Sequence, residues 1–222
     1  MVKSYSIAID GPSASGKSTV AKIIARKLNF IYVDTGAMYR AFTYAVLKAG
    51  LDPTDEKISE TLIGKIDISF DDNNNILLDG IDVSKKVRDN DVANNVSYIA
   101  SYKNIRLFLV DLQRKIANDK NVVMDGRDIG TYVLSNADLK IYQIASAEER
   151  AKRRYKENLE RGLETSYQEC LDNVNKRDYI DSHRAFCPLQ PAEDSVEINT
   201  TNMSIDEVVD SIINLAKERG IC

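Results

Sequence analysis

The sequence predicts an α/β fold with a central parallel sheet and helices on both faces. Short apolar runs alternate with longer stretches in which apolar residues recur every three or four positions. The connections between them are short, which favours parallel strands joined by covering helices. A chain of 222 residues is long enough to bury a substantial core. It contains no apolar run of about 18 residues or more, so we expect no membrane span.

The first part of the chain follows this alternation closely. Residues 7–9 read as a short buried strand, and residues 17–28 have apolar positions at helical spacing. Residues 30–33 form the next predicted strand, and residues 37–48 form a helix that Gly50 brings to an end. We therefore expect strand, helix, strand and helix in that order.

The pattern changes in the middle of the chain. Residues 66–70 and 76–78 are apolar and flank the asparagine run 73–75, which predicts a small antiparallel hairpin. Because the hairpin stands where the alternation should continue, we interpret it as an insertion into the α/β core. One long helical stretch is predicted over residues 92–117.

The alternation resumes in the second half, without repeats or a clear domain boundary, so we expect one domain over residues 1–222. Predicted strands are 122–124, 139–144 and 195–199, and predicted helices are 148–160, 167–179 and 206–219.

Composition narrows the partners and the compartment. The net charge is −4 with both signs mixed along the chain, which predicts neither a nucleic-acid nor a membrane partner. Cys170, Cys187 and Cys222 lack metal-ligand or redox spacing, so we expect reduced thiols. The chain begins directly with a strand pattern and without a targeting segment. A soluble, cytoplasmic protein is the expectation.

The stretch 11–18 fits G-x-x-x-x-G-K-[ST] and lies between a predicted strand and a predicted helix. Its small residues let backbone N–H groups surround a phosphate, and the following helix adds its positive end. Lys17 can reach the β- and γ-phosphates, and Ser18 can ligate Mg²⁺. The alternative is a flexible turn with a chance lysine. The predicted ATP-binding loop consists of Gly11, Pro12, Ser13, Ala14, Ser15, Gly16, Lys17, Ser18 and Thr19.

Two further strand ends carry charged side chains. Residues 34–40 follow the second strand and residues 125–130 follow a later one, which places both at the ligand-binding edge of a parallel sheet. Arg40 offers a planar guanidinium that suits a second phosphate. Taken alone, Arg40 could equally form a surface salt bridge. This alternative is less favoured because charged side chains follow both strands at the same edge of the sheet.

The segment 148–161 is dense in arginine for an acidic protein. Arg150, Arg153 and Arg154 fall on one helical face, and Arg161 follows. These arginines fit either a solvated amphipathic helix or a mobile lid over a triphosphate, and both remain open. For His183, hydrogen bonding or surface packing is favoured over catalysis.

A phosphate-binding loop also occurs in GTPases and ATPase motors. Residues 175–178 match the guanine-reading pattern N-K-x-D, but they follow one side of a polar helix and not a buried strand. The chain contains no D-x-x-G, which a γ-phosphate-sensing switch needs. It also shows no dedicated general base. A phosphate acceptor is already mostly dianionic at neutral pH because its second pKa is about 6, so no proton has to be removed. We infer a nucleoside monophosphate kinase.

The motifs GPSASGKST, DTGAMYR, DGRDIGT and RDYIDSHRAFCPLQPA resemble those of the bacterial-type cytidylate kinases, in the same order and through nearly the whole chain. The departures are small: Ala14 and Ser15 replace a common Gly-Ala pair, and Thr35 stands where serine is frequent. Both changes keep the backbone access or the hydroxyl. The resemblance implies transfer of the ATP γ-phosphate to CMP or dCMP with Mg²⁺, in pyrimidine metabolism.

The resemblance also implies a P-loop fold with a monophosphate-binding insertion at about residues 36–110 and a lid at about 148–164. On the lid interpretation of this segment, Arg150 and Arg154 are the predicted ATP contacts. Ser18 of the phosphate-binding loop is the predicted Mg²⁺ ligand, with Asp125 as a candidate second ligand. Catalytic charges fall on Lys17, Arg127, Arg153 and Arg177. The implied CMP-binding residues are Thr35, Arg40, Ser97, Arg106, Arg127, Asp128, Arg177, Asp181 and Arg184.

Base preference follows from hydrogen-bond chemistry. Cytosine presents an amino donor beside ring acceptors, which a carboxylate at Asp128 and a guanidinium at Arg106 complement. Uracil would aim a carbonyl oxygen at the carboxylate, at a cost of about 1–3 kcal/mol, or roughly 5- to 150-fold.

A kinase for UMP or dTMP and a regulator that binds ATP without turnover remain the alternatives. We expect a monomer whose partners are ATP and CMP or dCMP.

Overall fold

The computed structural model describes residues 3–221, which fold into two compact units. Unit 1 combines the chain up to Tyr32 with the chain from Asp119 onward, and unit 2 comprises Val33–Asn118. Within the described range no helix has both the length and the apolar character that a membrane span requires.

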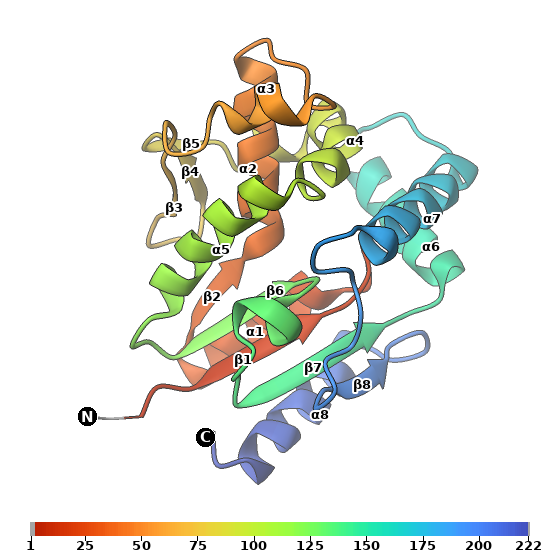
Figure 1. Cartoon of the computed structure of the whole chain (residues 1–222). Helices are drawn as coiled ribbons and strands as arrows, with labels where there is room; N and C mark the ends of the chain where they lie inside the picture. Colours follow the sequence, from red (N-terminus) through yellow and green to blue (C-terminus); the bar gives the residue numbers. More distant parts are fainter. Residues whose placement is uncertain (1–2, 222) are drawn as a thin grey trace. The chain divides into compact units, whose positions relative to one another are not determined.

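A five-stranded sheet lies at the centre of the predicted α/β pattern, and the order β2-β6-β1-β7-β8 confirms it (Figure 1). The pairings of β1 with β6, β1 with β7 and β7 with β8 are all parallel. Because β1 lies between two strands that come much later in the chain, its carboxyl end is a topological switch point, where ligands bind in such sheets. The strands are β1 (Ser6–Asp10), β2 (Ile31–Asp34), β6 (Val122–Gly126), β7 (Leu139–Ile144) and β8 (Val196–Asn199).

The two faces of the unit 1 sheet follow the period of two along each strand. Ile7, Val123 and Ile141 belong to one apolar cluster with residues of two helices, α1 (Lys17–Leu28) and α8 (Ile205–Glu218). The alternate residues point to the opposite face, where β1 and β6 contact a single π-helical turn, η2 (Ile129–Val133). This alternation decides which polar side chain at each strand end faces which side of the sheet.

Capping residues explain where several helices of unit 1 begin. Ser204 starts α8 with a capping box that includes Glu207, and Ser166 does the same for α7 (Tyr167–His183) with Glu169. The Ser146 side chain caps α6 (Ala147–Glu160). Residues 175–178 thus lie inside α7, as expected for a chance match to the guanine-reading pattern.

Unit 2 begins with α2, which Asp34 caps by accepting from Ala37 N at 2.7 Å. The predicted hairpin is confirmed, and a third strand extends it into an antiparallel sheet of order β3-β4-β5. The elements are α2 (Thr35–Lys48), α3 (Glu56–Glu60), β3 (Ile68–Phe70), β4 (Ile76–Leu78), β5 (Ile81–Asp82), η1 (Lys86–Arg88), α4 (Asn90–Ile99) and α5 (Lys103–Ala117).

The prediction of one continuous helix over residues 92–117 is wrong, because α4 ends at Ile99 and α5 begins at Lys103. The Ser101 hydroxyl donates to the Tyr98 carbonyl at 2.6 Å, which competes with helix continuation. The Tyr102 hydroxyl donates to the Pro53 carbonyl at 3.0 Å, so a contact distant in sequence holds the break. Helical spacing on both sides of the break conceals it in the sequence.

The cysteines and the histidine are placed as predicted where they are described. Cys170 is a buried free thiol, Cys187 is half-buried, and Cys222 lies outside the described residues. His183 is exposed at the end of α7, where its ring stacks on Tyr179 with centroids 4.2 Å apart. Its Nδ1 lies 2.9 Å from the Tyr179 carbonyl oxygen.

Candidate functional site

The phosphate-binding loop connects β1 to α1 and requires glycine at two positions. Gly16 forms the helix N-cap at φ 93°, and Gly11 has φ 148°. A Cβ atom on Gly11 would lie 2.0 Å from the backbone oxygen of Gln143, so only glycine lets the loop pass β7. The loop therefore has the shape and the backbone access that a phosphate cradle needs.

Lys17 is folded over this loop. Its Nζ donates to the Pro12 carbonyl at 2.7 Å and lies 3.4 Å from Ser15 Oγ, and the residue is only 4% exposed. Burial, together with the positive charge of Arg127, holds the pKa of Lys17 well below its ordinary value. An anion next to this amine would stabilise its charged form.

Oxygen ligands suited to a small hard cation lie beside the loop. Ser18 Oγ donates to Asp125 Oδ2 at 2.8 Å, and the Tyr32 hydroxyl donates to Asp125 Oδ1 at 2.7 Å. In the part of the chain that the structure describes, no group of three or more histidine, cysteine, aspartate or glutamate side chains is arranged to hold a metal ion by itself. One hydroxyl and one carboxylate fit Mg²⁺, which keeps several waters and takes its remaining oxygens from nucleotide phosphates.

Three side chains hold the loop through the Ser15 carbonyl. It accepts from Gln143 Nε2 at 2.6 Å, from Arg153 Nη1 at 3.1 Å and from Thr200 Oγ1 at 3.3 Å. Gln143 reaches it because it shares a face of β7 with the core residue Ile141. Side chains from α6, from β7 and from the residue following β8 therefore converge on one loop carbonyl.

A cationic cluster surrounds Asp181 on α7. Arg127 Nε donates to Asp181 Oδ2 at 2.8 Å. Burial would raise the pKa of Asp181, but Arg127, Arg177 and Arg184 outweigh burial and hold it below its ordinary value. The same carboxylate, with Asp125, raises the pKa of Arg127 although burial opposes this.

The cluster continues to Asp128 through Arg184. Arg184 Nη2 lies 3.5 Å from Asp128 Oδ1, and Arg184 Nε donates to the Cys187 carbonyl at 2.5 Å. The structure thus brings together five predicted acceptor residues in unit 1, where three guanidinium groups accompany two carboxylates. The excess positive charge suits an anionic ligand. The five residues are Arg127, Asp128, Arg177, Asp181 and Arg184.

Arg150 of α6 is more tightly held than a residue of a solvated helix would be. Arg150 is 4% exposed, donates to the Ser13 carbonyl at 3.2 Å and forms a bidentate ion pair with Asp178 at 3.1 and 2.6 Å. The solvated-helix alternative is therefore wrong for Arg150, because its guanidinium braces the phosphate-binding loop. Arg154 lies at the helix surface, 3.4 Å from Glu157. ATP contacts of Arg150 and Arg154 and a catalytic role of Arg153 stay predictions.

The remaining predicted acceptor residues lie in unit 2. Arg40 pairs with Asp34 at 3.1 Å, and its buried Nε has no hydrogen-bond partner among the described residues. A Cβ atom on Gly36 would lie 3.0 Å from Arg40 Nη1, so glycine leaves room for the guanidinium. Arg106 is 1% exposed, donates to the Ala100 carbonyl at 2.9 Å and lies over the Tyr39 ring. Thr35 and Ser97 are also buried.

Sequence reasoning missed Asp10, Asp34, Gln143 and Tyr32. Asp10 is buried at the end of β1, directly before the loop, and accepts from two backbone N–H groups. A carboxylate between an apolar strand and a phosphate-binding loop is unusual enough to have signalled its role. The contacts of Gln143 and Tyr32 depend on strand order. The residues next to them in the sequence do not indicate that either side chain lies at the site.

Comparisons with known proteins agree with this arrangement. Solved structures of similar fold include a protein from Eubacterium ventriosum, with a TM-score of 0.54 at 15% identity over 97% of this chain and 99% of that chain. The shikimate kinase of Bacteroides thetaiotaomicron has a TM-score of 0.50 at 13% identity over 96% and 98% of the two chains. These likenesses concern the fold alone.

Sequence relatives are far more similar. The cytidylate kinase of Bacillus subtilis is 46% identical over 99% of this chain and 100% of its own length. That of Streptococcus mutans is 51% identical over 93% of both chains. Residues 7–218 match the family described as cytidylate kinase. The chain therefore belongs to the cytidylate kinase family.

Proposed function

We propose that this protein transfers the γ-phosphoryl group of ATP to CMP and dCMP, giving ADP and the corresponding diphosphate, in pyrimidine nucleotide metabolism. The observation that carries the proposal is the presence in unit 1 of two cationic features. One is the phosphate-binding loop with buried Lys17, and the other is the arginine cluster around Asp181. A protein that binds one nucleotide has no use for the second feature.

On the donor side, Lys17 Nζ donates to a loop carbonyl and can exchange this partner for β- and γ-phosphate oxygens. Ser18 and Asp125 are the residues that would hold Mg²⁺, which neutralises developing charge on the phosphates when it is bound. Arg153 anchors the loop through Ser15 and thereby keeps the backbone amides oriented toward the phosphates.

On the acceptor side, the chemistry calls for positive charge and alignment. The acceptor phosphate is mostly dianionic at neutral pH, since its second pKa is about 6, so no base has to remove a proton. Arg127, Arg177 and Arg184 offset the repulsion between two anions. Thr35 and Arg40 are proposed phosphate contacts of unit 2, where the unpartnered Nε of Arg40 offers a donor.

Base selection is proposed to rest on Asp128, with Ser97 and Arg106 as further contacts. Asp128 is 3% exposed, and its Oδ1 lies 3.5 Å from Arg184 Nη2, so the carboxylate is held beside a guanidinium group. Such a carboxylate accepts from the cytosine amino group and repels a uracil carbonyl.

The test is a panel of monophosphates (CMP, dCMP, UMP, dTMP, AMP and GMP) offered with Mg-ATP while ADP release is followed. We expect CMP and dCMP to have the highest kcat/KM, and Asp128→Asn to reduce the preference for CMP over UMP by roughly 5- to 150-fold. Highest activity on UMP or dTMP would make this a kinase for another base. ATP binding without turnover of any monophosphate would make it a regulator.

We further propose that the enzyme acts as a cytoplasmic monomer without nucleic-acid or membrane partners. The mixed surface charge and net charge of −4 support this proposal. Size-exclusion chromatography with light scattering, at the concentration used in the assay, measures the oligomeric state. A mass twice that of the chain would contradict the proposed monomer.

A further inference from the structure

Asp10 connects the strand that leads into the phosphate-binding loop with the turn that follows β6. Its Oδ1 accepts from Ile129 N at 2.8 Å, and its Oδ2 accepts from Gly130 N at 2.7 Å. The residue is 4% exposed and immediately precedes Gly11, the first residue of the loop. One carboxylate therefore binds both leading N–H groups of η2 to the base of the loop.

The position of η2 matters because Arg127 and Asp128 directly precede it. Arg127 donates to Asp181, and Asp128 pairs with Arg184. The two side chains depart from a backbone segment whose next two N–H groups are held by Asp10. A shift of that segment would displace both side chains together.

Gly130 leaves little room for a side chain. A Cβ atom on Gly130 would lie 3.1 Å from Lys140 Cδ and 3.4 Å from Asp10 Oδ2. The aliphatic part of Lys140, on β7, and the Asp10 carboxylate therefore both lie close to this glycine. These contacts fix the position of the turn at the carboxyl end of the sheet.

A buried carboxylate at this position lowers the stability of the fold through its desolvation. Burial raises the pKa of Asp10 to about 7, and the two backbone N–H groups offset only part of that effect. Replacing Asp10 with neutral Asn keeps the shape and one acceptor oxygen and removes the desolvation cost of the charge. It also turns an NH2 group toward one of the two backbone N–H groups, so the turn loses one of its two hydrogen bonds to β1.

We propose that Asp10 is a positioning residue for phosphotransfer: it fixes the backbone that carries Arg127 and Asp128 relative to the start of the phosphate-binding loop. The proposal rests on the proposed function, because it assigns these two residues to the acceptor nucleotide. Phosphotransfer requires the two nucleotides to be aligned, and a displacement of about 1 Å can cost about 100-fold in rate. Asp10 provides this alignment through main-chain contacts, without touching a substrate.

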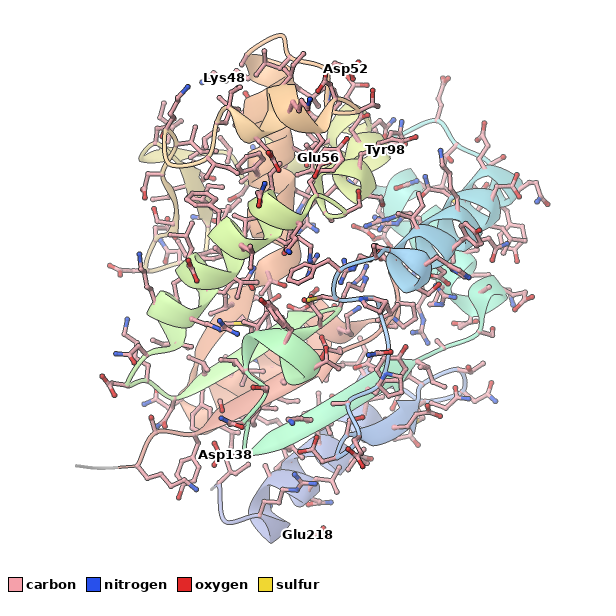
Figure 2. The ribbon with its side chains drawn as sticks, in the orientation of Figure 1. Lys48, Asp52, Glu56, Tyr98, Asp138 and Glu218 are labelled. Atoms are coloured by element: carbon pink, nitrogen blue, oxygen red, sulfur yellow. The ribbon has the colours of Figure 1, made fainter. Side chains whose placement is uncertain are left out.

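Asp10→Asn should lower kcat/KM for CMP by roughly 10- to 100-fold and reduce the preference for CMP over UMP, whereas KM for ATP should change less than about twofold. Asp138→Asn is the matched control. Asp138 accepts from Ser6 N at 2.9 Å, so it is bonded to the opposite end of the same strand, and it precedes β7 (Figure 2). This control should leave all three kinetic quantities unchanged.

Gly130→Ala is a second variant, because a methyl group there presses on the same turn from the Lys140 side. It should reproduce the CMP-specific loss and decides the question if Asp10→Asn does not fold. The proposal is overturned if the folded variants keep wild-type parameters for CMP, or if they lose CMP and ATP to the same degree. A wild-type protein that does not phosphorylate CMP refutes the proposed function itself, which separates the two failures.

Discussion

Gly11 is the position where the shape of the phosphate-binding loop is most tightly constrained. Its φ of 148° is one that residues with a Cβ rarely adopt, and a Cβ there would lie 2.0 Å from the Gln143 backbone oxygen. Real Cβ atoms essentially never approach closer than 3.0 Å, so the loop and β7 would have to separate. Because β7 lies inside the sheet between β1 and β8, it has little freedom to move.

The cost of Gly11→Ala has two parts. A non-glycine residue at this φ costs about 1–2 kcal/mol. Forcing a methyl group against packed backbone adds about 1–3 kcal/mol. The expected loss in the free energy of unfolding is therefore about 2–5 kcal/mol, and Tm should fall by about 4–20 °C for a chain of this size. ATP affinity should fall as well, because the loop amides move.

Gly162→Ala is the matched control in the same unit. Gly162 has φ 70°, and a Cβ atom there would have no neighbour within 4 Å among the described residues, so only the conformational cost of about 1–2 kcal/mol applies. Urea unfolding of both variants gives the two free energies directly. A Gly11→Ala variant that loses no more stability than Gly162→Ala would refute the argument that β7 excludes a side chain from the loop.

Three further predictions concern charge. Lys17→Ala should abolish phosphotransfer, because the amine that would bind the β- and γ-phosphates is removed. The fold should persist, because this amine donates only to groups of its own loop. Near-normal turnover would contradict the assignment. Arg40→Ala, which also leaves Asp34 without its partner, should raise KM for CMP far more than KM for ATP, and equal losses would count against it. Asp181 is buried, which would raise its pKa, but surrounding arginines including Arg127 lower it. A lowered pKa contributes stability that is present above pH about 4 and is lost as pH falls through the native-state value. Asp181→Asn should therefore be about 3–5 kcal/mol less stable at pH 7 and should lose less with acid, which urea unfolding from pH 7 to pH 3 measures; parallel curves would exclude the effect.

Local patterns in the sequence sufficed for the fold class and for the donor site. The alternation of apolar runs with helical spacing depends on the period of each element, which neighbouring residues encode. The loop motif 11–18 could be read directly because its chemistry resides in consecutive backbone amides. The family resemblance of the segment 177–192 also pointed to Arg177 and Arg184, and the structure gathers them around Asp181.

Only the tertiary structure decided which side chains hold these local pieces in place. Asp10 and Gly130 are 120 positions apart, and Arg150 lies 137 positions from the Ser13 carbonyl that it binds. The break between α4 and α5 likewise depends on Tyr102 reaching Pro53. A helical or strand period carries no information about partners so distant along the chain. Strand order and packing bring them together, and the resulting burial and neighbouring charges shift the pKa values of Lys17 and Asp181.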